Sequence, residues 1–247
     1  MSQTVSQIIF FRVKSSVKPE DPVSEEGEAL LKIFRTTQQQ SGHKHSSWGR
    51  TVEDKDTIVW VIDTSNPPTN LRPMGLIKPT DWTDPRSTIN IHLLEPFLAP
   101  ENPQPPSSLH VTFSPPLSCT ETLTKNPVTE LCTLSFPSDL DVLATRQINA
   151  DLISFRTTLV EQLPQSAGPR SWSMGHVDRP SKLTHEKSPS GQAFAHVLAV
   201  GWENGEAHLK AKETEKFVQG IAPLREKMLP PIPGLEIKHI SFQKIEG

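Results

Sequence analysis

The chain has 247 residues, enough for one large domain or for two domains of about 100 to 125 residues with a sizeable core. Its 25 basic and 28 acidic residues give a net charge of −3, which argues against nucleic acid as a main partner because no overall positive field is available. The 24 prolines, about twice the usual share, predict one irregular region.

The first half begins with a short apolar segment, residues 5–13, that is rich in β-branched and aromatic residues and predicts a buried strand. A helix follows, with Ser24 as its expected N-cap and an apolar stripe over residues 29–34. Residues 47–62 then read as a hairpin around an acidic turn. Residues 67–106 contain 10 prolines, which excludes a long helix there.

The second half repeats this order after a proline-containing connection. A strand is predicted at 128–136, and a helix with Ser138 as its expected cap continues an apolar stripe to Leu163. Two further strands follow, and residues 206–228 predict a helix that is interrupted around Gly220 and Pro223.

The two halves look like two copies of one unit. Residues 5–13 align without a gap on 128–136, and the final segments 109–113 and 238–242 share a histidine, an aliphatic, a hydroxyl residue and a phenylalanine. The order strand, helix, strand, strand, helix, strand is that of the ferredoxin-like unit. We therefore predict an α+β fold of tandem ferredoxin-like repeats.

The expected domain limits follow from this repeat. The first repeat spans 1–113 and includes the irregular segment 64–106, 114–127 is a linker, and the second repeat spans 128–247. The two sheets are expected to pack face to face through their non-helical sides, as an intramolecular pseudo-dimer whose further oligomerisation is left open.

The segments Ile8–Lys14, Trp48–Asp54 and Ile58–Asp63 resemble the dimeric α+β barrel superfamily, in particular its stress-responsive A/B barrel and antibiotic-biosynthesis-monooxygenase branches. The resemblance covers most of residues 5–63 and, more weakly, 128–244. It implies an intramolecular dimeric α+β barrel with a cavity between each sheet and its helices. Tandem versions resemble proteins of fungal natural-product pathways.

The sequence departs from the stress-responsive pattern at several positions. A histidine of the first strand is Gln7 in one copy and Glu130 in the other, and an aromatic residue after the third strand is Thr64 in one copy and Trp202 in the other. The chain has no tyrosine, so a polyketide-cyclase mechanism that pairs tyrosine with histidine cannot be carried over intact.

Strand alternation places residues of equal parity on one face, and the resemblance implies that one such face lines the cavity. A carboxylate near imidazoles among apolar walls is a workable acid/base set, because burial raises the pKa of a glutamate. The candidate catalytic residues are His110, Glu130, His196 and His239. The candidate substrate-binding residues are Phe11, Trp60, Cys132, Leu134, Leu198, Val200 and Trp202.

A structural interpretation stays open for each candidate. The histidines could bond backbone, Glu130 could be solvated, the tryptophans could be core residues, and Cys132 could be an inert buried thiol. His43 and His45 are expected on a surface loop, and no metal site is predicted because a site needs three or four ligands. Trp82 and His92 could face a ligand from a lid formed by the proline-rich segment.

We expect a small-molecule enzyme of secondary metabolism that performs acid/base-assisted cyclisation, isomerisation or rearrangement of a largely apolar, polyketide- or terpenoid-like intermediate. The alternatives are a cofactor-free monooxygenase and a non-catalytic ligand-binding or stress-response protein. The second half is the expected site, because Glu130, His196, Trp202 and His239 stand where the first half has Gln7, Ile58, Thr64 and His110.

The expected partner is a small-molecule substrate, with no nucleic acid and no membrane. No cofactor is expected: no glycine-rich phosphate loop or Gly-x-Ser-x-Gly motif occurs, and haem binding is a remote alternative. Two cysteines match neither a disulfide framework nor a zinc site, and no apolar run approaches the roughly 18 residues of a membrane span. The N-terminus lacks a signal-peptide pattern, so we expect a cytoplasmic protein.

Overall fold

The computed structural model describes residues 3–66, 91–100, 105–119 and 123–245. In the first half the strands and helices follow the predicted order, and the 3₁₀ helix η2 lies in the proline-rich region. The elements are β1 (Gln3–Arg12), α1 (Glu25–Gln38), β2 (His43–Thr51), β3 (Thr57–Asn66), η2 (Ile91–Phe97) and β4 (Ser107–Ser114).

The second half adds more helix than the first. Its elements are η3 (Leu117–Cys119), β5 (Val128–Pro137), α2 (Val142–Thr157), the π-helical turn η4 (Thr158–Gln162), β6 (Ser171–Arg179), β7 (Leu183–Thr184), β8 (Gln192–Trp202), α3 (Gly205–Glu213), α4 (Glu215–Arg225) and β9 (Lys238–Lys244).

Eight of the nine described strands form one closed antiparallel barrel. The strand order is β5-β9-β2-β3-β1-β4-β6-β8, and pairing of β8 with β5 closes the ring, while the short β7 pairs with β8 outside it. The two halves meet where β4 pairs with β6 and where β2 pairs with β9. Each of the eight strands therefore has a neighbour on both sides.

This architecture corrects the predicted fold class. The expected tandem ferredoxin-like repeats with two separate sheets packed face to face were wrong, because the outer strands of the two halves hydrogen-bond edge to edge. Pairing satisfies the backbone N–H and C=O groups that two separate sheets would leave at their edges. The internal repeat and the order of the elements, on which the prediction depended, do not encode which strand edges pair.

Two glycines permit close contact at these joints. A Cβ on Gly49 of β2 would lie 2.5 Å from the carbonyl oxygen of Ser241, and one on Gly175 of β6 would lie 2.6 Å from that of Thr112. Any larger residue would force the adjoining backbone apart. The closed barrel therefore depends on glycine at an equivalent place in each joint.

The barrel interior is filled by aliphatic and phenylalanine side chains. Along β1, Ile8 and Phe10 point inward, whereas Ile9 and Phe11 point outward, as strand alternation requires. Inward residues of the other strands complete the core, including Val59, Val61, Leu109, Val111, Leu131, Val177, Val197 and Ile240.

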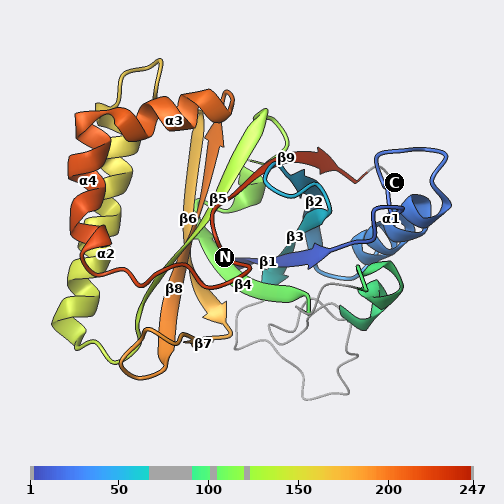
Figure 1. The fold of residues 1–247 in the computed structure, drawn as a ribbon, viewed down its shortest axis with the longest axis horizontal. Helices are drawn as coiled ribbons and strands as arrows, with labels where there is room; N and C mark the ends of the chain where they lie inside the picture. Colours follow the sequence, from blue (N-terminus) through green and yellow to red (C-terminus); the bar gives the residue numbers. More distant parts are fainter. Residues whose placement is uncertain (1–2, 67–90, 101–104, 120–122, 246–247) are drawn as a thin grey trace.

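Helices cover the outer face of the barrel on two opposite sides (Figure 1). α1 and η2 lie beside β1, β2 and β3, and α2, α3 and α4 lie beside β5, β6 and β8. A separate apolar core fills the space under each helical layer. The described helices include none long and apolar enough to cross a membrane.

Helix termini match the predictions in part. Ser24 caps α1 and accepts a hydrogen bond from the Gly27 amide at 3.0 Å, as predicted. The expected cap Ser138 was wrong, because Asp141 caps α2 and accepts from Ala144 at 2.7 Å. The predicted interruption near Gly220 and Pro223 falls instead at Thr214, which ends α3 and caps α4.

Candidate functional site

A mostly apolar cavity of about 130 Å³ lies in the second half, between the outer face of β5 and β8 and the helices α2, α3 and α4. Strand alternation turns every second residue of β5 and β8 toward these helices. The lining residues are Glu130, Cys132, Leu134, Phe155, Leu159, Leu198, Val200, Trp202, His208, Lys212, Phe217, Ile221, Arg225, Met228 and Ile237.

Glu130 is the acidic group of this lining. Its side chain is 10% exposed, and one carboxylate oxygen accepts a hydrogen bond from the Trp202 indole N–H at 2.9 Å. Burial raises the pKa of Glu130, which favours the protonated acid, while the Trp202 bond and nearby positive groups act in the opposite direction. Glu130 can therefore either donate or accept a proton at the cavity wall.

His208 of α3 lies directly against Glu130. Its Nε2 is 3.2 Å from Glu130 Oε2, and its ring stacks on Trp202 with centroids 5.1 Å apart. Asn204 fixes the start of this helix by accepting from the Ala207 amide at 2.9 Å. Burial lowers the pKa of His208 to about 3, with smaller contributions from His239 and Lys212, so the ring is neutral near pH 7.

His239 of β9 connects this pair to the first half of the chain. Its Nε2 is 2.7 Å from His208 Nδ1, and its Nδ1 is 2.6 Å from a carboxylate oxygen of Glu53. The His239 backbone N–H also donates to both Glu53 oxygens at 3.1 Å. Glu53 lies between β2 and β3, so four side chains from both halves form one connected line.

Glu130, His208 and His239 also present three ligand atoms within 4.8 Å of one another, a spacing that a metal ion could use. These residues could either share a metal ion or contact one another in pairs, and the geometry of the His208 ring distinguishes the two arrangements. Its Nδ1 is hydrogen-bonded to His239 and its Nε2 lies 3.2 Å from Glu130 Oε2, whereas a metal ion binds in front of a single ring nitrogen. The three residues therefore fit a line of pairwise contacts better than a shared metal centre.

The structure brings most of the predicted second-half residues together. Glu130 and the predicted substrate-binding residues of this half line the cavity, and His239 adjoins it through His208. Burial raises the pKa of the Cys132 thiol, so this residue stays protonated and serves as an apolar wall. The predicted wall residues found here are Cys132, Leu134, Leu198, Val200 and Trp202.

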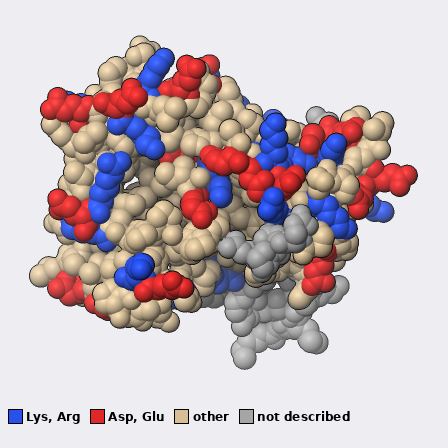
Figure 2. All heavy atoms as spheres, in the orientation of Figure 1, with Lys and Arg blue, Asp and Glu red and all other residues tan. Residues whose placement is uncertain are grey.

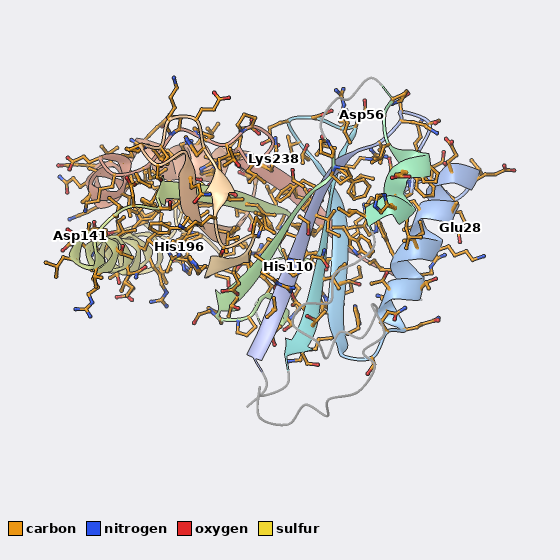
Figure 3. All side chains as sticks on the ribbon, turned by 90° about the horizontal axis from the view of Figure 1, so that it is seen from below. Glu28, Asp56, His110, Asp141, His196 and Lys238 are labelled. Atoms are coloured by element: carbon orange, nitrogen blue, oxygen red, sulfur yellow. The ribbon has the colours of Figure 1, made fainter. Side chains whose placement is uncertain are left out.

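His196 lies apart from Glu130 and His239. It pairs in register with Leu134, four residues along β5 from Glu130, and its ring contacts Phe194 and His176 at centroid distances of 6.0 and 5.1 Å. Burial lowers its pKa to about 4, with a smaller effect from His176. Figure 3 shows His196 in the half that contains α2.

The predicted residues of the first half lie outside this cavity. His110 is buried on β4 opposite Gln7, near the middle of the molecule (Figure 3). Trp60 and Phe11 belong to the core under α1 and η2, where the Trp60 ring packs on Phe34 at a centroid distance of 4.3 Å. These positions provide packing for the first half.

Three further expectations concern side chains near the irregular segment and β2. His43 and His45 were expected on a surface loop, but they lie in β2, where burial lowers the pKa of both. His92 lies on η2 and is exposed, with Nδ1 2.6 Å from a Glu95 oxygen. Trp82 lies outside the described residues.

Sequence reasoning missed His208, Lys212 and Glu53. His208 occupies the first turn of a helix that was predicted immediately after the Trp202 strand, so its place near the cavity was within reach of the sequence. Glu53 lies in the predicted acidic turn, but its contact with His239 spans 186 residues and depends on barrel closure. Local patterns contain no signal for such a contact.

Three solved structures share the fold of this chain. A protein described as a "Putative Chlorite dismutase" is 12% identical, with a TM-score of 0.55 over 99% of this chain and 96% of that one. An anthrone oxidase-like protein is 9% identical, with a TM-score of 0.55 over 99% and 94%. A "putative monooxygenase" from Lactobacillus acidophilus NCFM is 9% identical, with a TM-score of 0.50 over 97% and 94%.

At these identities the likeness shows the fold alone. The predicted resemblance to the dimeric α+β barrel superfamily was wrong. The structure is a single closed barrel, and its structural neighbours are named as a putative chlorite dismutase, an anthrone oxidase-like protein and a putative monooxygenase. No family model matches the chain. No curated protein matches it.

Proposed function

We propose that the cavity is the active site of a small-molecule enzyme in which Glu130 and His208 exchange a proton with a mostly apolar substrate. The observation that supports this most directly is the position of Glu130. It is a buried acid, hydrogen-bonded to Trp202 and adjacent to a neutral His208, on an otherwise apolar wall. Such a pair exchanges protons without a layer of water between catalyst and substrate.

The volume of the cavity limits the enclosed part of the substrate. About 130 Å³ is close to the roughly 150 Å³ cavity that holds a benzene molecule in another protein, so we expect one ring or an equivalent aliphatic group. Lys212 and Arg225 are the basic residues on the lining, and they favour a ligand with a hydroxyl or other acidic group. A haem macrocycle does not fit this volume.

A second candidate is an oxygen-dependent version of the same proton abstraction. Two of the similar structures are named as a putative monooxygenase and as an anthrone oxidase-like protein, which supports a reaction in which the deprotonated substrate meets dioxygen. Cyclisation, expected from the sequence, is not retained because these names do not support it. Oxygen uptake with a panel of one-ring hydroxyarenes, lost in Glu130→Gln, is the result expected for this second candidate.

Binding of 4-nitrophenol tests the primary proposal, because this probe has one ring and its phenolate is coloured. Wild-type protein should bind it and change its ratio of phenol to phenolate at fixed pH. Glu130→Gln should still bind the probe but lose this change, since the amide cannot exchange the proton. Absence of binding to the wild-type protein overturns the proposal.

Two substitutions on α4 form a matched pair for this experiment. Ile221 lines the cavity, whereas Val218 on the same helix is exposed. Ile221→Trp should fill the cavity and abolish binding, and Val218→Trp should leave binding unchanged. Equal binding by both variants would place the probe elsewhere.

A further inference from the structure

We infer that Glu130, His208, His239 and Glu53 form a proton relay that connects the cavity to the surface across the joint between the two halves. This inference rests on the proposed function of the cavity and adds two residues to it, Glu53 and His239, that do not line the cavity. The three links measure 3.2 Å from Glu130 to His208, 2.7 Å from His208 to His239 and 2.6 Å from His239 to Glu53. The second and third links are hydrogen bonds, and the first is a contact between a carboxylate oxygen and a ring nitrogen at a distance that allows proton exchange.

Exposure rises along the relay. The side chains of His208 and Glu130 are 4% and 10% exposed, whereas those of His239 and Glu53 are 21% and 39% exposed. Solvent therefore reaches the outer end, while the inner end faces an apolar cavity. A proton can be supplied to Glu130 or removed from it without water entering the cavity.

Counting protons defines the resting state. Each of the three links needs one proton between its two heavy atoms. The neutral rings of His208 and His239 supply one proton each. The third is on Glu130 when its O–H donates to His208 Nε2. His208 Nδ1–H then donates to His239 Nε2, and His239 Nδ1–H donates to the Glu53 carboxylate. Burial of Glu130, which favours its protonated form, and burial of His208, which favours the neutral ring, both agree with this state.

Transfer along the relay balances without any further reactant. The Glu130 O–H bond breaks as an N–H bond forms at His208 Nε2, and the His208 Nδ1–H bond breaks as one forms at His239 Nε2. Glu130 becomes a carboxylate, His208 remains neutral with its proton on the other nitrogen, and His239 becomes an imidazolium beside the Glu53 carboxylate.

The charges around the relay favour this concerted transfer. Lys212 of α3 acts electrostatically on both Glu130 and His208, and it disfavours a cationic His208. Glu53 instead stabilises positive charge on His239. The two protons therefore move together, with the positive charge at the exposed end, and Glu53 acts as a positioning residue.

The experiment measures which nitrogen of each histidine carries the proton, by ¹⁵N NMR of the full chain without ligand. While both rings are neutral and Glu130 is protonated, the wild-type protein should show both His208 and His239 as Nδ1–H tautomers.

Glu53→Gln provides the decisive comparison. The side-chain amide that this substitution introduces can donate to His239 Nδ1, so all three links can form while Glu130 is ionised. Both histidines should then convert to Nε2–H tautomers as the pH rises, although the substitution is at the exposed end. The matched control is Glu95→Gln, which makes the same change at a similar 2.6 Å contact with the exposed His92 and should change neither His208 nor His239.

A His208 ring that responds to pH in Glu53→Gln as it does in the wild-type protein overturns the relay. So does an Nε2–H tautomer of His208 in the wild-type protein while His239 is neutral. This result is independent of 4-nitrophenol binding. Binding with uncoupled tautomers rejects the relay alone, and coupled tautomers without binding reject the proposed function alone.

Discussion

The two halves of the barrel place different residues on the same strand framework. Gln7 lies opposite Ile62 and His110, and Glu130 lies in the same way opposite Val200 and His239. Ile62 and Val200 are thus equivalent positions, and the residues two places before them, Trp60 in the first half and Leu198 in the second, are equivalent as well. The comparison shows which side chains turn a packed layer into a cavity.

In the first half the space under the helix is filled. Trp60 is fully buried and packs on Phe34, and the Gln7 amide donates to the Ser108 hydroxyl at 2.9 Å. In the second half the smaller Leu198 borders the cavity, and Glu130 bonds to Trp202. A smaller apolar residue together with an exchangeable acid thus distinguishes the candidate site from its counterpart.

Charge does not distinguish the halves in the same way. On the face drawn in Figure 2, acidic and basic side chains are interspersed over the described surface, which agrees with the net charge of −3. The predictions therefore concern the residues of the cavity and the relay and their counterparts in the first half.

The largest expected effect is on Glu130. Glu130→Gln should reduce kcat by about 10²- to 10⁴-fold for any one-ring substrate that the wild-type protein converts, because the amide cannot act as acid or base. Gln7→Met, at the equivalent position of the first half, should change kcat little. Steady-state kinetics on folded protein measures both, and equal losses contradict the assignment of the site to the second half.

The next effect separates two equivalent histidines. His239→Ala should reduce activity by about 10²-fold, because it interrupts the relay between Glu130 and Glu53. His110 lies opposite Gln7, and His110→Ala should lower the stability of the fold more than it lowers activity. A larger loss of activity at His110 would point to the first half.

An exchange of the paired residues tests the origin of the cavity. Leu198→Trp should abolish 4-nitrophenol binding and destabilise the fold by about 1–3 kcal/mol through overpacking. Trp60→Leu should create a void under α1 and cost about 2–4 kcal/mol, below the upper range for a full truncation to alanine. Urea unfolding gives the stability changes, and unaltered probe binding by Leu198→Trp would show that Leu198 does not limit the cavity.

Much of the cavity wall was predictable from the sequence, but the contact between Glu53 and His239 was not. Period-two alternation is sufficient to place Glu130, Leu198 and Trp202 on one face, where they line the cavity. The same alternation could not show that His196 lies apart from Glu130, because it specifies the face on which a side chain lies and not the position along the strand. The contact of Glu53 with His239 arises only when β2 pairs with β9, which was the part of the fold predicted wrongly.

A further expected effect is a difference between the acid responses of two buried groups, His196 in the second half and Asp63 in the first. An unfolded histidine takes up a proton near its ordinary pKa of 6.5, but burial keeps His196 neutral until about pH 4. Between these values the unfolded state binds more protons, so this group lowers stability as the pH falls, by about 1.4 kcal/mol for each pH unit at most. His196→Leu should flatten the decline below pH 6.5.

Asp63 of the first half should act in the opposite direction. Burial raises its pKa from the ordinary 3.8 to about 6, so between these values the folded state binds the extra proton and stability rises as the pH falls. Asp63→Asn keeps the shape and the Ser6 contact but removes the buried charge, so its advantage over the wild-type protein should be largest above pH 6 and shrink toward pH 4. Urea midpoints across this range measure both variants. An Asp63→Asn advantage that is constant with pH would show that this carboxyl does not titrate in the folded protein.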